Sequence, residues 1–211
     1  MNKKISFVKI SLGICAVLVI VSILFVYHIF NIIKYKDKNV VTYLKNLKSY
    51  SCNTDITIKN DKQDVNYKCS QVYALGSGYR MELNKGRTMI FKENKIYVKD
   101  KENKATYVTP DSFDEVFKLS FIGEYIGMLY TNENTKYSLI KTNGVEYAII
   151  KITIPNQNRN IKYAEMYVDT KNNVPYKVSI YDDKDKERIQ IMYKEFKPNI
   201  SVDKGAFAIA K

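Results

Sequence analysis

Strand-like alternation of apolar and polar residues is the feature that most constrains the fold of this chain. Three such segments run almost back to back between residues 161 and 196, separated only by the polar turns TKNN and DDKDK. Side chains two residues apart lie on the same face of a strand, so each segment places an apolar row on one face. The pattern predicts an antiparallel sheet with one buried and one wetted face. The predicted rows are Ala164, Met166 and Val168, then Tyr176, Val178 and Ile180, then Ile189, Ile191 and Tyr193.

Further segments of the same kind occur earlier in the chain. They occupy residues 50–59, 65–73, 79–84, 87–93, 95–100, 105–110, 136–141 and 145–154, with short polar or Gly-containing turns between most of them. A single twisted antiparallel sheet of about ten strands is the simplest arrangement, and a sheet of that size tends to curl toward a barrel. The chain is therefore predicted to be mainly β (α+β).

One segment in the middle of the chain has helical spacing instead. After Pro110, Ser112 and Glu115 have the spacing of a capping box, which predicts a helix beginning at Ser112. Its apolar residues recur at steps of three and four. Two interpretations stay open, namely packing against the sheet or a lid over a cavity. The residues that would line such a cavity are Val116, Phe117, Ile122, Tyr125 and Ile126.

Residues 10–33 form an apolar run without Asp, Glu, Lys or Arg. At about 1.5 Å per residue, a helix of this length crosses a hydrocarbon core of about 30 Å, so we predict a retained single-pass transmembrane anchor. A cleaved signal peptide has a shorter apolar core, and lipidation of Cys15 would require a small residue where Ile14 stands. The predicted organisation is a cytoplasmic tail at 1–9, the anchor at 10–33 and an extracytoplasmic domain at 34–211, which opens with a short helix at 40–47.

Composition argues against several classes of function. The formal net charge of +12 favours acidic partners such as anionic lipid or anionic wall polymer. Nucleic acid is not predicted as a partner, because the basic residues are interspersed with acids and form no block or stripe. The single histidine, His28, lies within the apolar run, and no Gly-rich loop follows a strand and opens a helix. We therefore predict no catalytic residue, no cofactor and no metal site.

Two cysteines lie in neighbouring strand-like segments. If Cys52 lies opposite Cys69, the same register pairs Thr54 with Tyr67 and Ile56 with Val65, and it leaves Asn60 and Asp61 as a two-residue turn. In an oxidising location this register predicts a Cys52–Cys69 disulfide. The alternative is two independent free thiols.

Tyrosine is abundant, with 18 residues in the chain. Tyrosines on a sheet surface can bind a protein partner or an acyl chain, although tyrosine also simply suits strands. An antiparallel sheet has, in addition, two edges with unpaired backbone groups. A protein partner could therefore dock on a sheet edge or on a tyrosine-bearing outer face without any pocket.

Several residues in the strands and turns of this chain resemble those of a known family. They include the run MYVDTKNNVPYKVSIYDDKDKERIQIMYKEF at 166–196, the late Phe207 in GAFAIAK, and Tyr79, Arg80 and Glu82 in an early strand. Over roughly residues 38–210 this order of strands and turns is similar to that of LolA-like domains. Within that superfamily the chain most resembles the GerS group of germination lipoproteins from spore-forming bacteria.

This resemblance implies a fold and a function. The fold would be an open, strongly curved antiparallel half-barrel with helices over its concave face. The function would be that of a non-enzymatic, membrane-anchored protein needed for spore germination. Its partner would be a cortex-modifying N-acetylmuramoyl-L-alanine amidase of the CwlD kind, met in the intermembrane space of the forespore. A lipid or lipoprotein carrier with a cavity under the helix from Ser112 is the alternative, and a homodimer stays open.

Overall fold

The computed structural model describes residues 2–84, 86–131, 135–155 and 158–208 of the chain. The side chains of residues 2–14, 16, 30, 32–38 and 204 fall outside that description. Contacts divide the chain into two compact units, residues 1–39 and residues 40–211.

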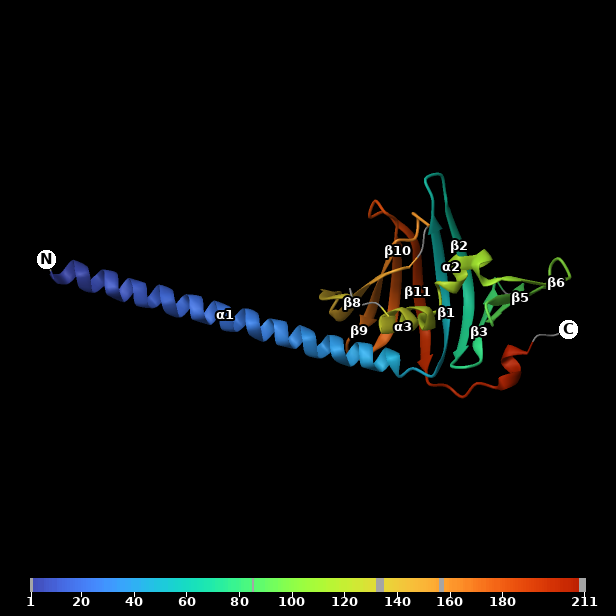
Figure 1. The fold of residues 1–211 in the computed structure, drawn as a ribbon, viewed down its shortest axis with the longest axis horizontal. Coiled ribbons are helices and arrows are strands. Elements are labelled where there is room, and N and C mark those ends of the chain that lie inside the picture. The colour runs from blue at the N-terminus through green and yellow to red at the C-terminus, as the bar shows by residue number, and fades with distance from the viewer. Residues whose placement is uncertain (1, 85, 132–134, 156–157, 209–211) are drawn as a thin grey trace. The chain divides into compact units, whose positions relative to one another are not determined.

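Helix α1 runs from Asn2 to Lys45 (blue in Figure 1). The separate short helix predicted at 40–47 is wrong, because residues 34–39 contain no Gly or Pro that would end α1 before Val40. The last turns of α1 belong to the second unit, where Val40 and Leu44 are buried.

The predicted transmembrane anchor at 10–33 finds no support in the structure. Among the residues that are described, no helix is both long enough and apolar enough to cross a bilayer. Part of the predicted anchor, including residues 10–14, lies outside the described side chains.

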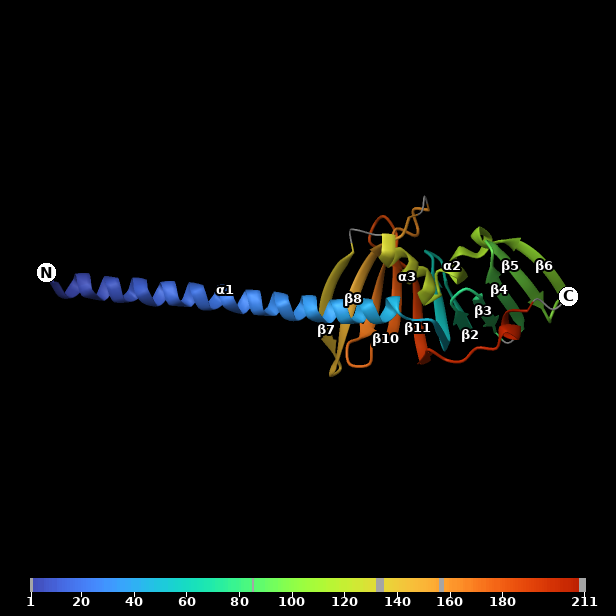
Figure 2. The ribbon, with the colours of Figure 1, turned by 60° about the horizontal axis from the view of Figure 1, so that its bottom comes forward.

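The second unit is built on one antiparallel sheet of eleven strands, which confirms the predicted mainly β architecture. The strand order is β6-β5-β4-β3-β2-β1-β11-β10-β9-β8-β7. Figure 2 shows the helices α2 (Glu115–Lys118) and α3 (Ile122–Thr131) in front of these strands. The strands are β1 (Ser49–Lys59), β2 (Asp64–Ala74), β3 (Gly78–Leu83), β4 (Arg87–Lys92), β5 (Lys95–Asp100), β6 (Ala105–Pro110), β7 (Lys136–Thr142), β8 (Val145–Thr153), β9 (Tyr163–Asp169), β10 (Val174–Tyr181) and β11 (Glu187–Pro198).

The sheet is open, and the predicted strong curvature toward a half-barrel is wrong. Its two edge strands, β6 and β7, lie at opposite ends of the order and do not pair with each other. A layer of helices covers one face, so the apolar side chains of that face are buried without the sheet closing on itself. The face under the helices is the inner face, and the opposite one is the outer face.

The seam at the middle of the sheet joins the two ends of the second unit. Strand β1 pairs with β2 on one side and with β11 on the other, from Tyr50 opposite Pro198 to Ile58 opposite Ile189. Just beyond the seam, the Asn199 N–H donates to the Ser49 carbonyl at 2.7 Å. The sheet therefore consists of two meanders, β1–β6 and β7–β11, held together by one strand pair.

Alternate residues of the central strands point to the inner face and form the core, as the sequence predicts. These side chains come from both meanders, so one core spans the seam. Fully buried examples are Ile56, Met81, Ile96, Ile150, Met166, Val178 and Ile191.

Tyr176 departs from the predicted pattern. The pairing of β10 with β9 shifts between Pro175 and Lys177, which is a bulge with one extra residue. Tyr176 lies on the outer face and is 41% exposed, whereas Val178 points inward. The prediction that these two residues share a face is wrong, because Pro175 has no N–H for the ladder and the strand adjusts around it.

The predicted helix from Ser112 is divided into three pieces. The N-cap residues of the first two pieces are Pro110 and Asp114, and neither makes a side-chain cap hydrogen bond, so no helix begins at Ser112 as predicted. The pieces are the 3-10 helix η1 (Asp111–Asp114), α2 (Glu115–Lys118) and α3 (Ile122–Thr131).

Strand side chains hold the break between α2 and α3. The Tyr50 hydroxyl accepts a hydrogen bond from the Ile122 N–H at 3.0 Å, and the Tyr193 hydroxyl donates to the Ser120 carbonyl at 2.9 Å. The side-chain amide of Gln71 donates to the Ser120 hydroxyl at 2.6 Å. In residues 119–122, the pinned turn, strands β1 and β11 therefore satisfy backbone groups that a continuous helix would satisfy internally, and β2 holds the Ser120 side chain.

Candidate functional site on the outer face of the sheet

The five predicted cavity-lining residues lie between the helices and the inner face. Phe117, Ile122, Tyr125 and Ile126 are buried, Val116 is half-buried, and all five pack in or against the core. The grooves found on the outer face are lined by other residues. This placement agrees with the packing interpretation of the helical segment, and the cavity stays a prediction.

Cys52 and Cys69 are free thiols, so the predicted disulfide is wrong. The strands pair two residues away from the predicted register, with Cys52 opposite Gln71 and Cys69 opposite Thr54. The turn is the cause, because the side-chain oxygen of Asn60 accepts the N–H groups of residues 62 and 63 and widens the loop to 60–63. Burial raises the pKa of both thiols, that of Cys69 to about 12, so both stay protonated and unreactive at neutral pH.

The outer face of β8, β9 and β10 carries a group of five tyrosines. The strand alternation that buries Ala164 and Val168 on the inner face turns these rings outward. Two pairs stack across strands, with ring centroids 4.9 Å apart for Tyr163 and Tyr181 and 5.0 Å apart for Tyr147 and Tyr176. The surface formed by Tyr147, Tyr163, Tyr167, Tyr176 and Tyr181 is the tyrosine face.

Lysine side chains fix two further contacts on the tyrosine face. The Lys151 ammonium lies 3.6 Å from the ring centroid of Tyr163, and that of Lys177 lies 4.1 Å from the ring centroid of Tyr167. Each cation–π contact of this exposed kind is worth about 0.5–1 kcal/mol. Stacked and capped rings lose little freedom when a partner covers them, so the tyrosine face is pre-ordered for binding.

Two hydroxyls of the tyrosine face, those of Tyr163 and Tyr167, remain neutral at physiological pH. Burial, together with the hydrogen bond to Asp185 at 2.9 Å, raises the pKa of Tyr163 to about 12. Burial and the neighbouring Glu165 also raise the pKa of Tyr167. These two rings therefore offer neutral hydroxyls that can donate or accept a hydrogen bond.

Charges beside the tyrosine face are largely paired. Lys59 contacts Glu187 across β1 and β11, and Lys194 contacts Asp55 across the same seam. Exposed pairs of this kind contribute little to stability. They leave the outer face near the seam with both signs of charge, which suits a protein partner better than a uniformly anionic surface.

The carboxylate cluster in the DDKDK turn is structural. Asp182 is only 2% exposed, and its carboxylate accepts the N–H groups of Lys184 and Lys186 at 2.9 Å and the Arg188 guanidinium at 2.7 Å. Burial favours the neutral acid, but these donors outweigh it and lower the pKa of Asp182. The sequence analysis recognised the turn and not the burial of this carboxylate. In the described part of the chain, no group of three or more His, Cys, Asp or Glu side chains could hold a metal ion.

A second outer-face feature lies at the other end of the sheet. The segment containing η2 (Lys204–Phe207) is held against β3, where the Arg80 guanidinium donates to the Ala206 carbonyl at 3.0 Å. Phe207 is buried. Between this segment and β6 lies a groove of about 230 Å³, the edge groove. Sequence analysis singled out Phe207 through a family resemblance and had no periodic signal for the groove. Its lining residues include Arg80, Ile90, Tyr97, Lys99, Lys101 and Val108.

Comparison with protein families identifies the group to which the chain is related. Residues 9–207 match the family described as "Sporulation protein YdcC-like". The chain belongs to the family of YdcC-like sporulation proteins. This match confirms the sporulation-associated part of the resemblance seen in the sequence. A search of curated proteins found no match.

Several solved structures are similar to this chain, and one of them, with a TM-score above 0.5, shares its fold. An uncharacterized conserved protein from Thermus thermophilus is 8% identical with a TM-score of 0.54, and the match covers 81% of this chain and 91% of that chain. The structure of the CwlD amidase from Clostridioides difficile in complex with the GerS lipoprotein is matched at 23% identity and a TM-score of 0.47, over 77% of this chain and 92% of that chain. A LolA superfamily protein from Nitrosomonas europaea is 11% identical with a TM-score of 0.42, over 82% and 97% of the two chains.

Proposed function

We propose that this YdcC-like family member is a non-enzymatic binding protein of spore germination that binds and activates a cortex-modifying amidase of the CwlD kind through its tyrosine face. The observation that carries the proposal is the ordering of five outward tyrosines by ring stacking and cation–π contacts. Aromatic rings with polar tips are enriched at protein–protein interfaces, because they bury large apolar area at small entropic cost. Family membership and the resemblance to the GerS group support the choice of partner.

A binding role also fits the chemistry of the chain. The single histidine lies outside the second unit, and Cys52 and Cys69 are buried with raised pKa values. The carboxylate of Asp182 is committed to its turn. No described cluster therefore combines a nucleophile with a base in the way that hydrolysis requires.

The amidase acts on cell-wall peptidoglycan, so the second unit is proposed to lie outside the cytoplasmic membrane, in the intermembrane space of the forespore. Protease added to forespores whose outer membrane has been opened should then digest residues 40–211. Protection of these residues in forespores with an intact inner membrane would contradict this location.

The decisive experiment measures amidase activity on cortex peptidoglycan with and without the purified chain. We expect activation and a complex on size-exclusion chromatography. The double variant Tyr147→Ser, Tyr176→Ser should weaken the complex roughly 30-fold, because it removes one of the two aromatic pairs of the surface. Tyr130→Ser is the matched control, because Tyr130 is 65% exposed on α3 and lies on the helix side.

Equal amidase activity with and without the chain, and no complex, would contradict the proposal. Copurifying lipid in that outcome would favour the lipid carrier, whose cavity would be lined by Phe117, Ile122 and Tyr125.

A further inference from the structure

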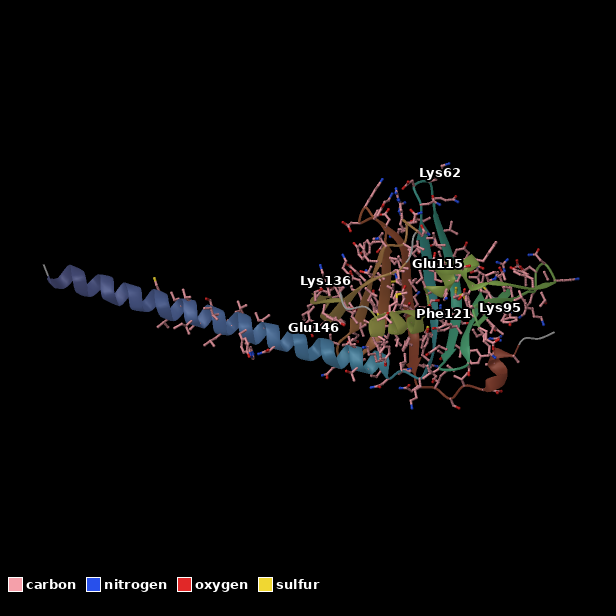
Figure 3. All side chains as sticks on the ribbon, in the orientation of Figure 1. Lys62, Lys95, Glu115, Phe121, Lys136 and Glu146 are labelled. Carbon is pink, nitrogen blue, oxygen red and sulfur yellow. The ribbon has the colours of Figure 1, made fainter. Side chains whose placement is uncertain are left out.

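The two edges of the sheet differ in how they resist pairing with another strand. Figure 3 labels Lys95, on β5 next to the β6 edge, and Lys136, on the β7 edge, at opposite sides of the sheet. Edge strand β7 has the sequence KYSLIKT and carries Lys136 and Lys141. Edge strand β6 has the sequence ATYVTP and carries no charge. Lysines on an edge discourage the addition of another strand, so β7 is protected and β6 is not.

The unprotected edge also exposes apolar side chains. Tyr107 and Val108 are 44% and 53% exposed, although both belong to a strand of Thr, Tyr and Val with high β propensity. In the strand order of the described chain, β6 has β5 on one side and no strand on the other. Its outward backbone N–H and C=O groups are therefore available to an added strand.

The edge groove continues the surface of β6 across the outer face. Val108 lies opposite Tyr97, and Tyr97 lies opposite Ile90, which gives one apolar row. Two residues along the strand, Thr106 lies opposite Lys99. A strand added beside β6 would extend both rows at a spacing of about 4.8 Å.

The charge of the edge groove selects the occupant. Its charged lining residues are Arg80, Lys99 and Lys101, and no acidic residue lines it. Arg80 is paired with Glu82 at 2.7 Å. Lys99 and Lys101 have no ion pair in the described part of the chain. Two unpaired ammonium groups beside an apolar row favour a ligand that has both an apolar and an acidic side chain.

We propose that β6 and the edge groove bind an extended acidic segment of a partner protein as an added β-strand. The segment carries an apolar side chain in line with Val108 and an acidic side chain two residues away, in line with Thr106 and Lys99. Main-chain hydrogen bonds supply affinity and the two side-chain rows supply specificity. This inference does not depend on the tyrosine face or on the amidase.

A second copy of the chain fits the same edge less well. Pairing of β6 with β6 would bring Lys99 and Lys101 of both copies to one surface, where like charges repel. An acidic segment neutralises the same charges.

The test uses the full chain and a labelled synthetic peptide. The peptide is built mainly of Thr, with one Val and one Glu placed two residues apart so that both side chains lie on the same face of the added strand. Binding is followed by fluorescence anisotropy, and hydrogen exchange is followed on β6 and β7. We expect peptide-dependent protection of the β6 amides, unchanged exchange in β7, and weaker binding at high salt. The double variant Lys99→Glu, Lys101→Glu should bind the peptide at least tenfold more weakly and should prefer a peptide with Lys in place of Glu.

The matched control carries the same charge reversal on the protected edge, as Lys136→Glu with Lys141→Glu, and should bind the peptide as the unmodified chain does. Circular dichroism and urea unfolding establish that each variant is folded. Equal protection of β6 and β7, absence of β6 protection, or binding that survives the charge reversal at Lys99 and Lys101 would each overturn the proposal. Concentration-dependent β6 protection without peptide would also overturn it, in favour of a second copy as the occupant.

Discussion

The two faces of the same sheet illustrate how one strand pattern can serve two purposes. On the inner face the alternate residues are buried. Hydrogen bonds hold the pinned turn over them: the Tyr50 hydroxyl accepts one from the turn, and Gln71 and Tyr193 each donate one to it. On the outer face the intervening residues of β8–β10 form the tyrosine face, where Tyr147 and Tyr176 stack in contact with solvent. The same residue type is thus committed to the fold on one face and left available for binding on the other.

The largest expected difference between the faces concerns truncation of an aromatic ring. Phe121 is fully buried on the inner side, with its ring centroid 4.5 Å from that of Tyr79 and 5.3 Å from that of Phe91. We expect Phe121→Ala to lower the free energy of unfolding by about 3–5 kcal/mol, measured by urea denaturation. Tyr176→Ala on the outer face should change it by no more than about 0.5 kcal/mol. Equal losses in the two variants would show that the outer face also contributes to the core.

A smaller effect is expected from removing one hydroxyl of the pinned turn. Tyr50→Phe leaves the buried Ile122 N–H without its acceptor. The free energy of unfolding should fall by about 1–3 kcal/mol, because an unsatisfied buried donor carries its full desolvation cost. The same substitution at Tyr176 serves as the control and should be nearly neutral. A neutral result for Tyr50→Phe would mean that the break between α2 and α3 does not depend on β1.

Two glycines of α3 sharpen the comparison within one helix. A Cβ on Gly123 would lie 2.6 Å from the Tyr79 hydroxyl, and Tyr79 is itself held between Tyr73 and Phe121 by stacking. Overpacking costs about 1–3 kcal/mol, against a gain in helix propensity of about 1 kcal/mol. Gly123→Ala should therefore be neutral to destabilising by about 2 kcal/mol.

Gly127→Ala is the matched control for this position, because a Cβ there meets nothing within 4 Å. It should stabilise the protein by up to about 1 kcal/mol. Thermal unfolding of the two variants gives the comparison, and stabilisation by both substitutions would show that α3 does not press on Tyr79.

The smallest expected effect concerns stability as a function of pH, to which two glutamates should contribute with opposite sign. Burial raises the pKa of the Glu124 carboxyl above its usual 4.5, in spite of Lys118 nearby. Burial of Glu187 acts in the same direction, but the hydrogen bond from Lys59 helps to outweigh it, so the pKa of Glu187 is lowered.

These opposite shifts predict opposite responses in urea unfolding. The raised pKa of Glu124 in the folded state contributes stability below about pH 4.5, and this stability is lost as the pH rises through the folded-state pKa. Glu124→Gln should therefore stabilise the protein at neutral pH and lose that advantage in acid. The lowered pKa of Glu187 in the folded state contributes stability above about pH 4.5, and this stability is lost as the pH falls through the folded-state pKa. Glu187→Gln should therefore destabilise the protein at neutral pH, and in acid its free energy of unfolding should approach that of the unmodified chain. If the free energies of unfolding of the two variants changed with pH in the same direction relative to the unmodified chain, the predicted opposite responses would be contradicted.

Much of the fold follows from local pattern. All eleven strands are visible as alternation, and the same alternation turns Tyr163 and Tyr167 outward once Ala164 and Met166 are assigned to the core. The errors arise where contacts distant in sequence override that pattern. The helix from Ser112 breaks because strand side chains satisfy the backbone of the pinned turn.

Local chemistry of turns and bulges accounts for other errors in the site. Asn60 widens the loop between β1 and β2, so Cys52 pairs with Gln71, two residues away from its predicted partner Cys69. The bulge after Pro175 places Tyr176 on the opposite face from the one predicted. The edge groove was not predicted, because it depends on the segment before residue 208 returning to β3. No spacing within that segment encodes this contact.

The seam between β1 and β11 has a consequence for how the chain reaches its native state. These partners are separated by almost the whole second unit, so the pairing has high contact order and requires the closure of a long loop. During synthesis, β1 remains with one side unpaired until β11 emerges. Before that moment the β1–β6 meander has β1 as a second open edge in addition to β6. This is the period of greatest exposure to aggregation and the step at which a chaperone would have most effect.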